Sequence, residues 1–149
     1  MKKMITVVAI MAAMISNVAF AGSGGEKIDK RIKQAFEKEF SGAADVKWYA
    51  YDRYTKVDFT INSMHLMAFY NNEGESMGVA RNIPYSSLPL RLQLDNKKNY
   101  KSYWITAIYE LANGEGTRYY LTLENADKTI QFVSDANNSW ELLNREAKK

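Results

Sequence analysis

Few residues of this sequence have side chains that commonly do chemistry. It has one histidine, His65, and no cysteine, which excludes disulfides, thiolate zinc sites, a cysteine nucleophile and metal sites built from several histidines. His65 lies in a strand-like segment with no serine-nucleophile motif, as is typical of a packed or surface histidine. No P-loop or dinucleotide-binding motif occurs. Asp45, Asp52 and Asp58 leave open a hydrolase that uses a pair of carboxylates.

One loop matches the spacing of a calcium-binding loop. The matching residues are Asp135, Asn137, Ser139 and Glu146, but Trp140 stands where the sharp turn of such a loop requires glycine. We therefore expect no metal, no cofactor and no catalytic residue, and we predict that the protein is not an enzyme.

The N-terminus has the pattern of an export signal. Lys2 and Lys3 precede an apolar run over residues 4–15, and Ala19 and Ala21 supply the small residues that signal peptidase accepts. The run is shorter than the roughly 20 residues that cross a bilayer. We predict a signal peptide over 1–21, cleaved near Ala21, a mature chain over 22–149 without a membrane span, and a periplasmic location.

The charge composition gives no reason to expect a nucleic-acid partner. There are 20 basic and 17 acidic residues, and the basic residues form no concentrated patch of the kind that binds phosphates.

Apolar spacing predicts one clear helix followed by short strands. Ser23 and Glu26 have the spacing of a capping box, and Ile28, Ile32 and Phe36 recur every four residues. Period-two alternation then predicts strands. The predicted strands cover residues 46–51, 54–61, 64–70, 77–79, 103–111, 118–124 and 129–133, with 140–143 closing the fold. Residues 83–99 fit either a short helix or a strand.

The two halves of the chain have similar patterns. At an offset near sixty residues, the segment 54–59 matches 118–123 and the segment 68–74 matches 131–137. We predict an α+β fold of two tandem units, each a helix plus an antiparallel meander, with the helices packed on one face of the sheet. The units span about 26–82 and 84–144 of a single domain.

Several of these segments also resemble one protein family. They are the helix end Phe36-Glu37-Lys38-Glu39-Phe40-Ser41-Gly42-Ala43, the strands Val46-Lys47-Trp48 and Tyr54-Thr55-Lys56-Val57-Asp58-Phe59, Ala68-Phe69-Tyr70 before a turn, and Ser87-Leu88-Pro89. Together with the export signal, they are similar to PepSY-like proteins, also described as β-lactamase-inhibitor-protein-like (BLIP-like). The resemblance implies helices on an antiparallel sheet, the periplasm of a Gram-negative bacterium, and a non-catalytic inhibitory or regulatory binding role. The inhibitors behind the second name carry disulfides, which this chain cannot form, so inhibition of β-lactamase is not carried over.

Tyrosine is abundant, with ten residues. Alternation places several tyrosines on the sheet face opposite the predicted core, and tyrosine offers a large rigid contact area with a polar tip. We predict a partner-binding face open to solvent, formed by Tyr49, Tyr51, Tyr54, Lys56, Asp58, Arg118 and Tyr120. Cross-strand pairing that merely steadies the sheet explains these residues equally well.

Three functions follow from these patterns. The first is an exported module that binds an envelope protein or peptide. The second is a carrier of a small apolar ligand, in a pocket between helix and sheet near Phe36, Phe40 and Trp48. The third is the carboxylate hydrolase.

Overall fold

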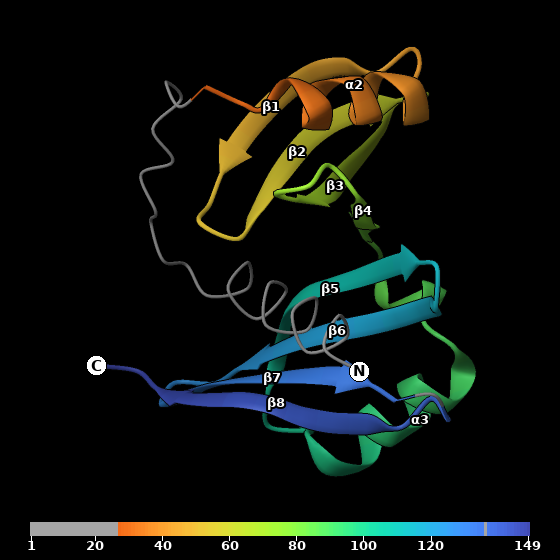
Figure 1. The fold of residues 1–149 in the computed structure, drawn as a ribbon. Helices are drawn as coiled ribbons and strands as arrows, with labels where there is room; N and C mark the ends of the chain where they lie inside the picture. Colours follow the sequence, from red (N-terminus) through yellow and green to blue (C-terminus); the bar gives the residue numbers. More distant parts are fainter. Residues whose placement is uncertain (1–26, 136) are drawn as a thin grey trace. The chain divides into compact units, whose positions relative to one another are not determined.

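The protein is mainly a β structure. The computed structural model describes residues 27–135 and 137–149, so the predicted signal peptide over 1–21 and the predicted cap residues Ser23 and Glu26 lie outside the described residues. The elements, shown in Figure 1, are α2 (Lys30–Glu39), β1 (Ala44–Ala50), β2 (Tyr54–Ile61), β3 (Met64–Asn71), β4 (Ser76–Asn82), the 3-10 helix η1 (Tyr85–Ser87), α3 (Leu90–Asn99), β5 (Trp104–Asn113), β6 (Gly116–Glu124), β7 (Lys128–Ser134) and β8 (Trp140–Ala147).

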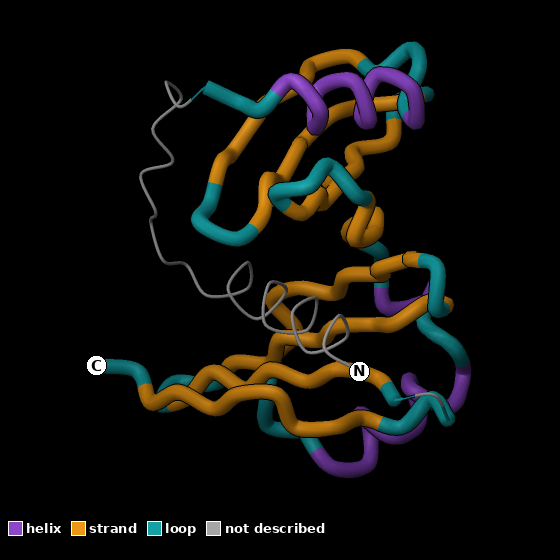
Figure 2. Tube along the Cα trace, viewed as in Figure 1, coloured by secondary structure: helices purple, strands orange, loops and turns teal. Residues whose placement is uncertain are grey.

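The predicted fold class, an α+β arrangement of two tandem helix-plus-meander units, is wrong. The eight strands belong to one sheet in the order β1 to β8, and strand dominates the tube in Figure 2, with α2 and α3 contributing ten residues each. Alternation of apolar and polar residues shows where strands form, but it carries no information about which strands join in one sheet. The boundaries near 26–82 and 84–144 stay a prediction.

Helix α2 begins later than the sequence pattern suggests. The side chain of Asp29 accepts a hydrogen bond from the backbone N–H of Arg31 and caps the helix, which starts at Lys30. Aspartate is a preferred N-cap because its carboxylate satisfies an N–H that has no partner within the helix. The predicted cap pair Ser23 and Glu26 lies outside the described residues, and the helix that the structure describes starts at Lys30.

The described chain divides into two compact units. The α2 unit comprises residues 27–81 and 112–116, and the α3 unit comprises residues 82–111, 117–135 and 137–149.

In the α2 unit, α2 lies across the strands, as Figure 1 shows, and closes a core with them. The register of β2 with β3, in which Val57 pairs with Ala68, puts alternate residues on this core face, as alternation predicts. The core residues are Ile32, Phe36, Val57, Phe59, Ala68 and Tyr70.

In the α3 unit, leucines and aromatic residues form a separate core. Trp140 of β8 packs against it, and its indole N–H donates to the backbone oxygen of Leu92 in α3 at 3.0 Å. The helical alternative for residues 83–99 is confirmed, because Leu90–Asn99 form α3. Pro89 stands at the N-cap position without a side-chain capping bond, and its fixed φ is compatible with a helix start. The core residues are Ile83, Leu88, Leu92, Ile108, Leu121, Leu123, Ile130 and Phe132.

Both end strands of the sheet are irregular. In β1, the pairing with β2 shifts between Ala44 and Lys47, and Asp45 within this segment has a φ of 53°. In β8, Leu143 is an extra residue opposite the step from Gln131 to Phe132. Such bulges bend a strand and interrupt its hydrogen-bond ladder.

Candidate functional site on strands β1, β2 and β6

The structure distributes the predicted binding residues over both units. Five of the seven come together on or next to β1 and β2 of the α2 unit, and the other two lie on β6 of the α3 unit. The first group is Tyr49, Tyr51, Tyr54, Lys56 and Asp58, called here the β1–β2 aromatic cluster.

A lysine holds one side of the β1–β2 aromatic cluster together. Tyr49 and Lys56 are directly paired across the two strands, and the Lys56 ammonium lies 4.5 Å from the centre of the Tyr49 ring. The same ammonium lies 3.2 Å from a carboxylate oxygen of Asp58. Because Lys56 and Asp58 are mostly buried, at 17% and 18% side-chain exposure, solvent screens this pair less than an exposed one. The lysine therefore fixes the Tyr49 ring.

Two stacked rings form the other side of the cluster. Tyr51 and Tyr54 lie with ring centres 4.6 Å apart, and Tyr54 also contacts Phe69 of β3 at 6.2 Å. Tyr54 is only 9% exposed, and this burial, with a smaller effect of Tyr51, raises the pKa of its hydroxyl to about 12. Tyr49 and Tyr51 are half-buried, so they are the tyrosines of this cluster that solvent reaches.

Tyr120 on β6 is fully buried. Burial raises the pKa of its hydroxyl to about 12, although the positive charge of Arg118 opposes the shift. The expectation that the predicted tyrosines are open to solvent is therefore wrong for Tyr54 and Tyr120. Local alternation shows which face a side chain lies on, but not whether that face is covered. A binding role for these residues stays a prediction.

Sequence reasoning missed two neighbours of Tyr120. Thr122 of β6 and Gln131 of β7 are directly paired, lie on the face that carries Tyr120, and are 2% and 3% exposed. The Tyr120 hydroxyl, the Thr122 hydroxyl and the Gln131 side-chain oxygen have no hydrogen-bond partner in the described part of the chain. The available signal was a run of polar residues at alternate positions between leucines and isoleucines.

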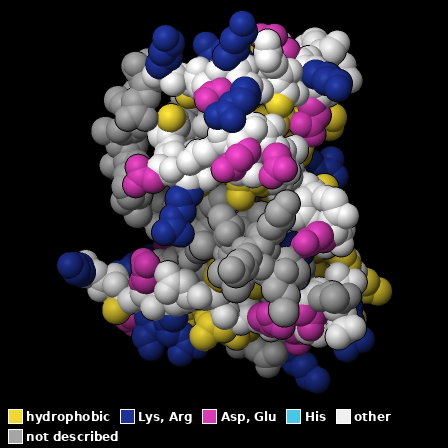
Figure 3. All heavy atoms as spheres, in the orientation of Figure 1, with side chains coloured by type: hydrophobic (Ala, Val, Ile, Leu, Met, Phe, Trp, Pro, Cys, Tyr) yellow, Lys and Arg dark blue, Asp and Glu magenta, His cyan; other side chains and the backbone are white. Residues whose placement is uncertain are grey.

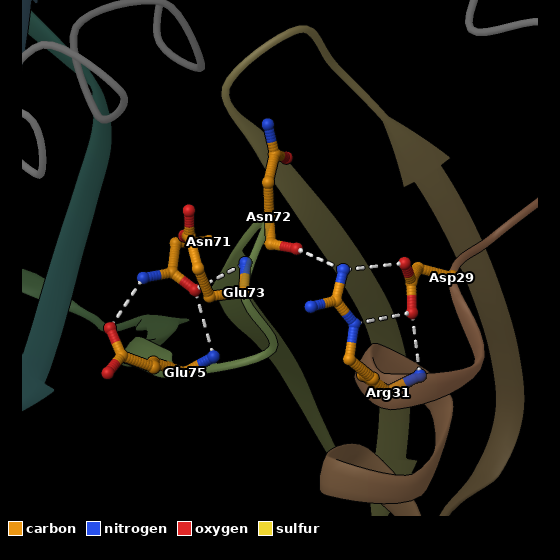
Figure 4. Close-up of polar contacts among 6 residues, drawn as sticks. All are labelled: Asp29, Arg31, Asn71, Asn72, Glu73 and Glu75. Atoms are coloured by element: carbon orange, nitrogen blue, oxygen red, sulfur yellow. Dashed lines mark hydrogen bonds and ion pairs between the residues drawn. The ribbon is translucent and has the colours of Figure 1, made fainter.

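A second polar cluster, shown in Figure 4, is structural. Arg31 binds the carboxylate of Asp29, with one contact at 3.0 Å, and donates to the backbone oxygen of Asn72 in the β3–β4 turn. The arginine lowers the pKa of Asp29 through side-chain and backbone hydrogen bonds. The side-chain oxygen of Asn71 accepts hydrogen bonds from the backbone N–H groups of Glu73 and Glu75. These contacts tie the start of α2 to the turn.

The residues considered for catalysis do not assemble. His65 is exposed and pairs across strands with Thr60. The Thr60 hydroxyl donates to the carboxylate of Asp45, whereas Asp58 binds Lys56 and Asp52 is exposed.

The residues considered for metal binding are used otherwise. Asp135 accepts the backbone N–H groups of Asn137 and Ser139, which makes an ordinary turn. Glu146 lies on β8 and accepts a hydrogen bond from Asn144. Among residues 27–135 and 137–149, no three histidine, aspartate or glutamate side chains are grouped so that they could hold a metal ion.

Aromatic rings pack against one another in the region between α2 and the strands, where an apolar-ligand carrier would need a pocket. The ring centre of Phe36 lies 5.4 Å from that of Phe40, 5.1 Å from that of Trp48 and 5.0 Å from that of Phe59. Rings at these separations are in contact. Of the three residues proposed to line the pocket, Phe36 therefore belongs to the core, and Phe40 and Trp48 are partly buried and pack against it.

The face drawn in Figure 3 has mixed charge. Basic and acidic side chains are interspersed on the face in Figure 3, in agreement with the similar numbers of the two kinds in the sequence. Within the described residues, no helix has the length and apolar character needed to cross a membrane.

Comparisons with known proteins show the fold. No protein-family model matches the chain, and no curated protein matches it. A DUF2874 family protein from Bacteroides uniformis is similar in structure, with a TM-score of 0.70 at 11% identity over 81% of this chain and 90% of that one. A "putative periplasmic" protein from Bacteroides eggerthii has a TM-score of 0.70 at 12% identity, over 82% of this chain and 90% of that one. A BLIP-like protein from Bacteroides fragilis has a TM-score of 0.64 at 16% identity, over 83% of this chain and 89% of that one.

These likenesses define the class of fold. The chain has the fold of the BLIP-like and DUF2874 structures, as the BLIP-like part of the resemblance implies. The PepSY-like part of that resemblance stays a prediction.

Proposed function

We propose that this chain is a non-catalytic, exported periplasmic module that binds a protein or peptide of the cell envelope, in an inhibitory or regulatory role. The proposed location draws on the export-signal pattern and on the fold shared with a "putative periplasmic" protein. The proposed absence of catalysis draws on the scattered polar residues described above and on the BLIP-like and DUF2874 names of the similar structures.

The observation that carries the proposal is the β1–β2 aromatic cluster. Tyr49 and Tyr51 are partly accessible, yet each is held in place, Tyr49 by the ammonium of Lys56 and Tyr51 by the ring of Tyr54. A side chain that is already ordered loses little conformational entropy when a partner docks on it, and tyrosine is enriched where proteins bind one another. The cluster is thus suited to act as a preorganised contact surface.

Site-specific photocrosslinking in living cells tests the proposal. A photoreactive phenylalanine analogue is placed at Tyr49 or at Tyr51, and the matched control carries it at Glu37, an exposed position on α2. We expect a discrete crosslinked species from the two tyrosine positions, absent from the control. Only Tyr49 and Tyr51 are replaced. Tyr54 and Tyr120 are buried, so replacing them could disturb folding, and a loss of crosslinking could not be assigned to binding.

A second set of variants tests the energetic contribution of the cluster. Tyr49→Ser and Tyr51→Ser, each combined with a crosslinking analogue at the other position, should weaken or remove the crosslinked species while the urea midpoint of the purified protein stays close to that of the wild type. Crosslinks of equal strength from Glu37 and from the tyrosine positions would refute a specific surface at β1 and β2.

A further inference from the structure

The outer face of α3 carries leucines that the core of the α3 unit does not use. Leu92 and Asn96 of this helix are buried, whereas Leu90 and Leu94 are 69% and 59% exposed. Because they are four residues apart, Leu90 and Leu94 are neighbours on one face of the helix. Keeping large apolar side chains in water is unfavourable, and an exposed apolar patch commonly marks a surface that contacts another body.

Basic side chains surround Leu94 on the same face. Arg91 precedes Leu94 by three residues and Lys98 follows it by four, so both are its neighbours on the helix surface. Both are exposed. Asp95 is the only acid in α3, and it is half-buried and already has an interaction partner. The outer face of α3 is therefore both apolar and positively charged.

Strand β8 continues this character beside α3. The hydrogen bond from Trp140 to the backbone of α3 places the two elements next to each other (Figure 1). Leu142 pairs with the core residue Phe132 and is 55% exposed. Arg145 pairs with the core residue Ile130 and is also exposed. Residues directly paired across antiparallel strands lie on the same face, so Leu142 and Arg145 are on the side of the sheet that α3 covers.

The acidic residues of β8 lie on the other side of the sheet. Glu141 pairs with Val133 and Glu146 pairs with Thr129, and these two residues of β7 alternate with its core residues. The side of the α3 unit that carries α3 thus gathers exposed leucines and cations. We call this surface the α3–β8 face, and its residues are Leu90, Arg91, Leu94, Lys98, Leu142 and Arg145.

The positive charge of the α3–β8 face is local. The chain as a whole is close to neutral, with 20 basic and 17 acidic residues. In the part of the chain that the structure describes, none of the three cations of this face forms an ion pair with a carboxylate. They come from elements that are far apart in the sequence, which is why no concentrated basic patch is visible along the chain.

We propose that the α3–β8 face binds the surface of a membrane that contains anionic phospholipid. The three leucines enter the boundary between headgroups and acyl chains, and the three cations contact the negatively charged phosphates. Lysine and arginine are long enough to keep their charge among the headgroups while neighbouring apolar side chains are buried. Helix α3 has ten residues and is about 15 Å long, so it lies along the membrane and not across it.

The residue types favour a lipid surface over an acidic protein as the occupant. The residues that contribute most to binding between proteins are mainly tryptophan, tyrosine and arginine, and leucine is under-represented among them. Exposed leucine combined with lysine and arginine is typical of helices that lie in a membrane interface. This inference goes beyond the proposed function, because it concerns the α3 unit and does not depend on the β1–β2 aromatic cluster.

Cosedimentation with lipid vesicles tests the proposal. The protein is used as the predicted mature chain, 22–149, because the apolar run of the predicted signal could bind lipid by itself. We expect binding to vesicles of equal parts phosphatidylglycerol and phosphatidylcholine, weaker binding as salt is raised, and little binding to vesicles of phosphatidylcholine alone. Absence of binding to the mixed vesicles, or equal binding to the two kinds of vesicle, would overturn the proposal.

The double variant Leu90→Gln with Leu94→Gln tests the apolar part of the face. Glutamine has nearly the helix propensity of leucine and both positions are exposed, so the urea midpoint should stay close to that of the wild type. Binding to the mixed vesicles should weaken about tenfold or more. The control Met64→Gln, at an apolar position of the α2 unit that is 46% exposed, should bind like the wild type. Full binding by the double leucine variant would reject insertion of α3.

The double variant Arg91→Gln with Lys98→Gln tests the charged part. Each cation at an anionic membrane surface contributes about fivefold in affinity, so this variant should bind about 25-fold more weakly. The matched control is Lys30→Gln with Lys33→Gln, which removes two exposed positive charges from α2 and should change binding little. Equal losses in the two double variants would show only a general charge effect and overturn the proposal.

Two further measurements separate this proposal from other interpretations. Binding of soluble polyglutamate without binding of vesicles would assign the α3–β8 face to an acidic protein and overturn the membrane proposal. Tyr49→Ser and Tyr51→Ser should bind the mixed vesicles like the wild type, because both positions lie in the α2 unit. A failure of vesicle binding and a failure of the photocrosslinks are therefore separate results.

Discussion

Replacing Tyr120 by phenylalanine should make the protein more resistant to alkali without harming it at neutral pH. The change deletes only a hydroxyl, and that hydroxyl is buried and unpaired within the described chain. Removing a buried polar atom that has no partner is neutral or stabilising. At pH 8 we therefore expect the free energy of unfolding of Tyr120→Phe to equal or exceed that of the wild type.

The effect of pH follows from the direction of the pKa shift. The pKa of Tyr120 is about 12 in the folded protein and about 10 in an unfolded chain. Above pH 10, the unfolded chain loses its proton while the folded protein keeps it, so stability falls as pH rises. At pH 11 this difference in proton binding lowers the free energy of unfolding by about 1.4 kcal/mol, since one pKa unit corresponds to about 1.4 kcal/mol. The phenylalanine variant lacks this loss.

Urea unfolding followed by circular dichroism at pH 8 and pH 11 measures the difference. Between these pH values, the wild type should lose about 1.4 kcal/mol more than Tyr120→Phe. Tyr70→Phe is the contrasting variant, because the Tyr70 hydroxyl donates to Glu39 at 2.7 Å. Burial and this hydrogen bond raise the pKa of Tyr70, so Tyr70→Phe should gain alkaline resistance but lose about 1 kcal/mol at pH 8.

Two results would refute this reasoning. If Tyr120→Phe and the wild type lost the same free energy between pH 8 and pH 11, the Tyr120 hydroxyl would titrate at its ordinary value. If Tyr120→Phe were destabilised at pH 8 as much as Tyr70→Phe, the Tyr120 hydroxyl would have a partner.

Three further changes test the packing of each unit. Phe36→Ala removes the ring at the centre of the aromatic core of the α2 unit and should cost about 3–5 kcal/mol in urea unfolding; a cost below 1 kcal/mol would contradict that packing. Asn71→Ala deletes the side chain that accepts hydrogen bonds from two backbone N–H groups of the β3–β4 turn. It should lower the free energy of unfolding in urea by about 1–2 kcal/mol. The neighbouring variant Glu73→Ala should lower it little. Trp140→Phe keeps a ring but loses the indole hydrogen bond to Leu92, so the α3 unit should lose about 1 kcal/mol and the backbone amides of α3 should exchange hydrogen faster. Unchanged exchange there would argue against that bond.

The sequence was most informative where one face of a strand is core. Val57 and Phe59 of β2, and Leu121 and Leu123 of β6, alternate with polar residues, and each pair is buried in its core as predicted. A period of two is a direct consequence of strand geometry and needs no knowledge of distant partners. The positions of most strands were therefore predictable from local pattern alone.

Features that depend on distant contacts were not predictable in this way. The joining of eight strands in one sheet depends on pairings between segments, and the burial of Tyr54 and Tyr120 depends on what lies over them. Both positions show the same polar-side alternation as the accessible Tyr49, so the pattern cannot distinguish them. The N-cap was missed for a related reason, because Asp29 and Ser23 are both good caps by type.

The two end strands bear on how the proposed module would bind a partner. A sheet can bind a peptide by adding it as a further strand at an edge, or by contacting it through side chains on a face. Here each edge is interrupted by an extra residue, in β1 near Asp45 and in β8 at Leu143, and β8 also carries the charged Glu141 and Arg145. Bulges and charges at an edge oppose the addition of a strand. The proposed recognition is therefore expected to use a face of the sheet, such as the one that carries the β1–β2 aromatic cluster.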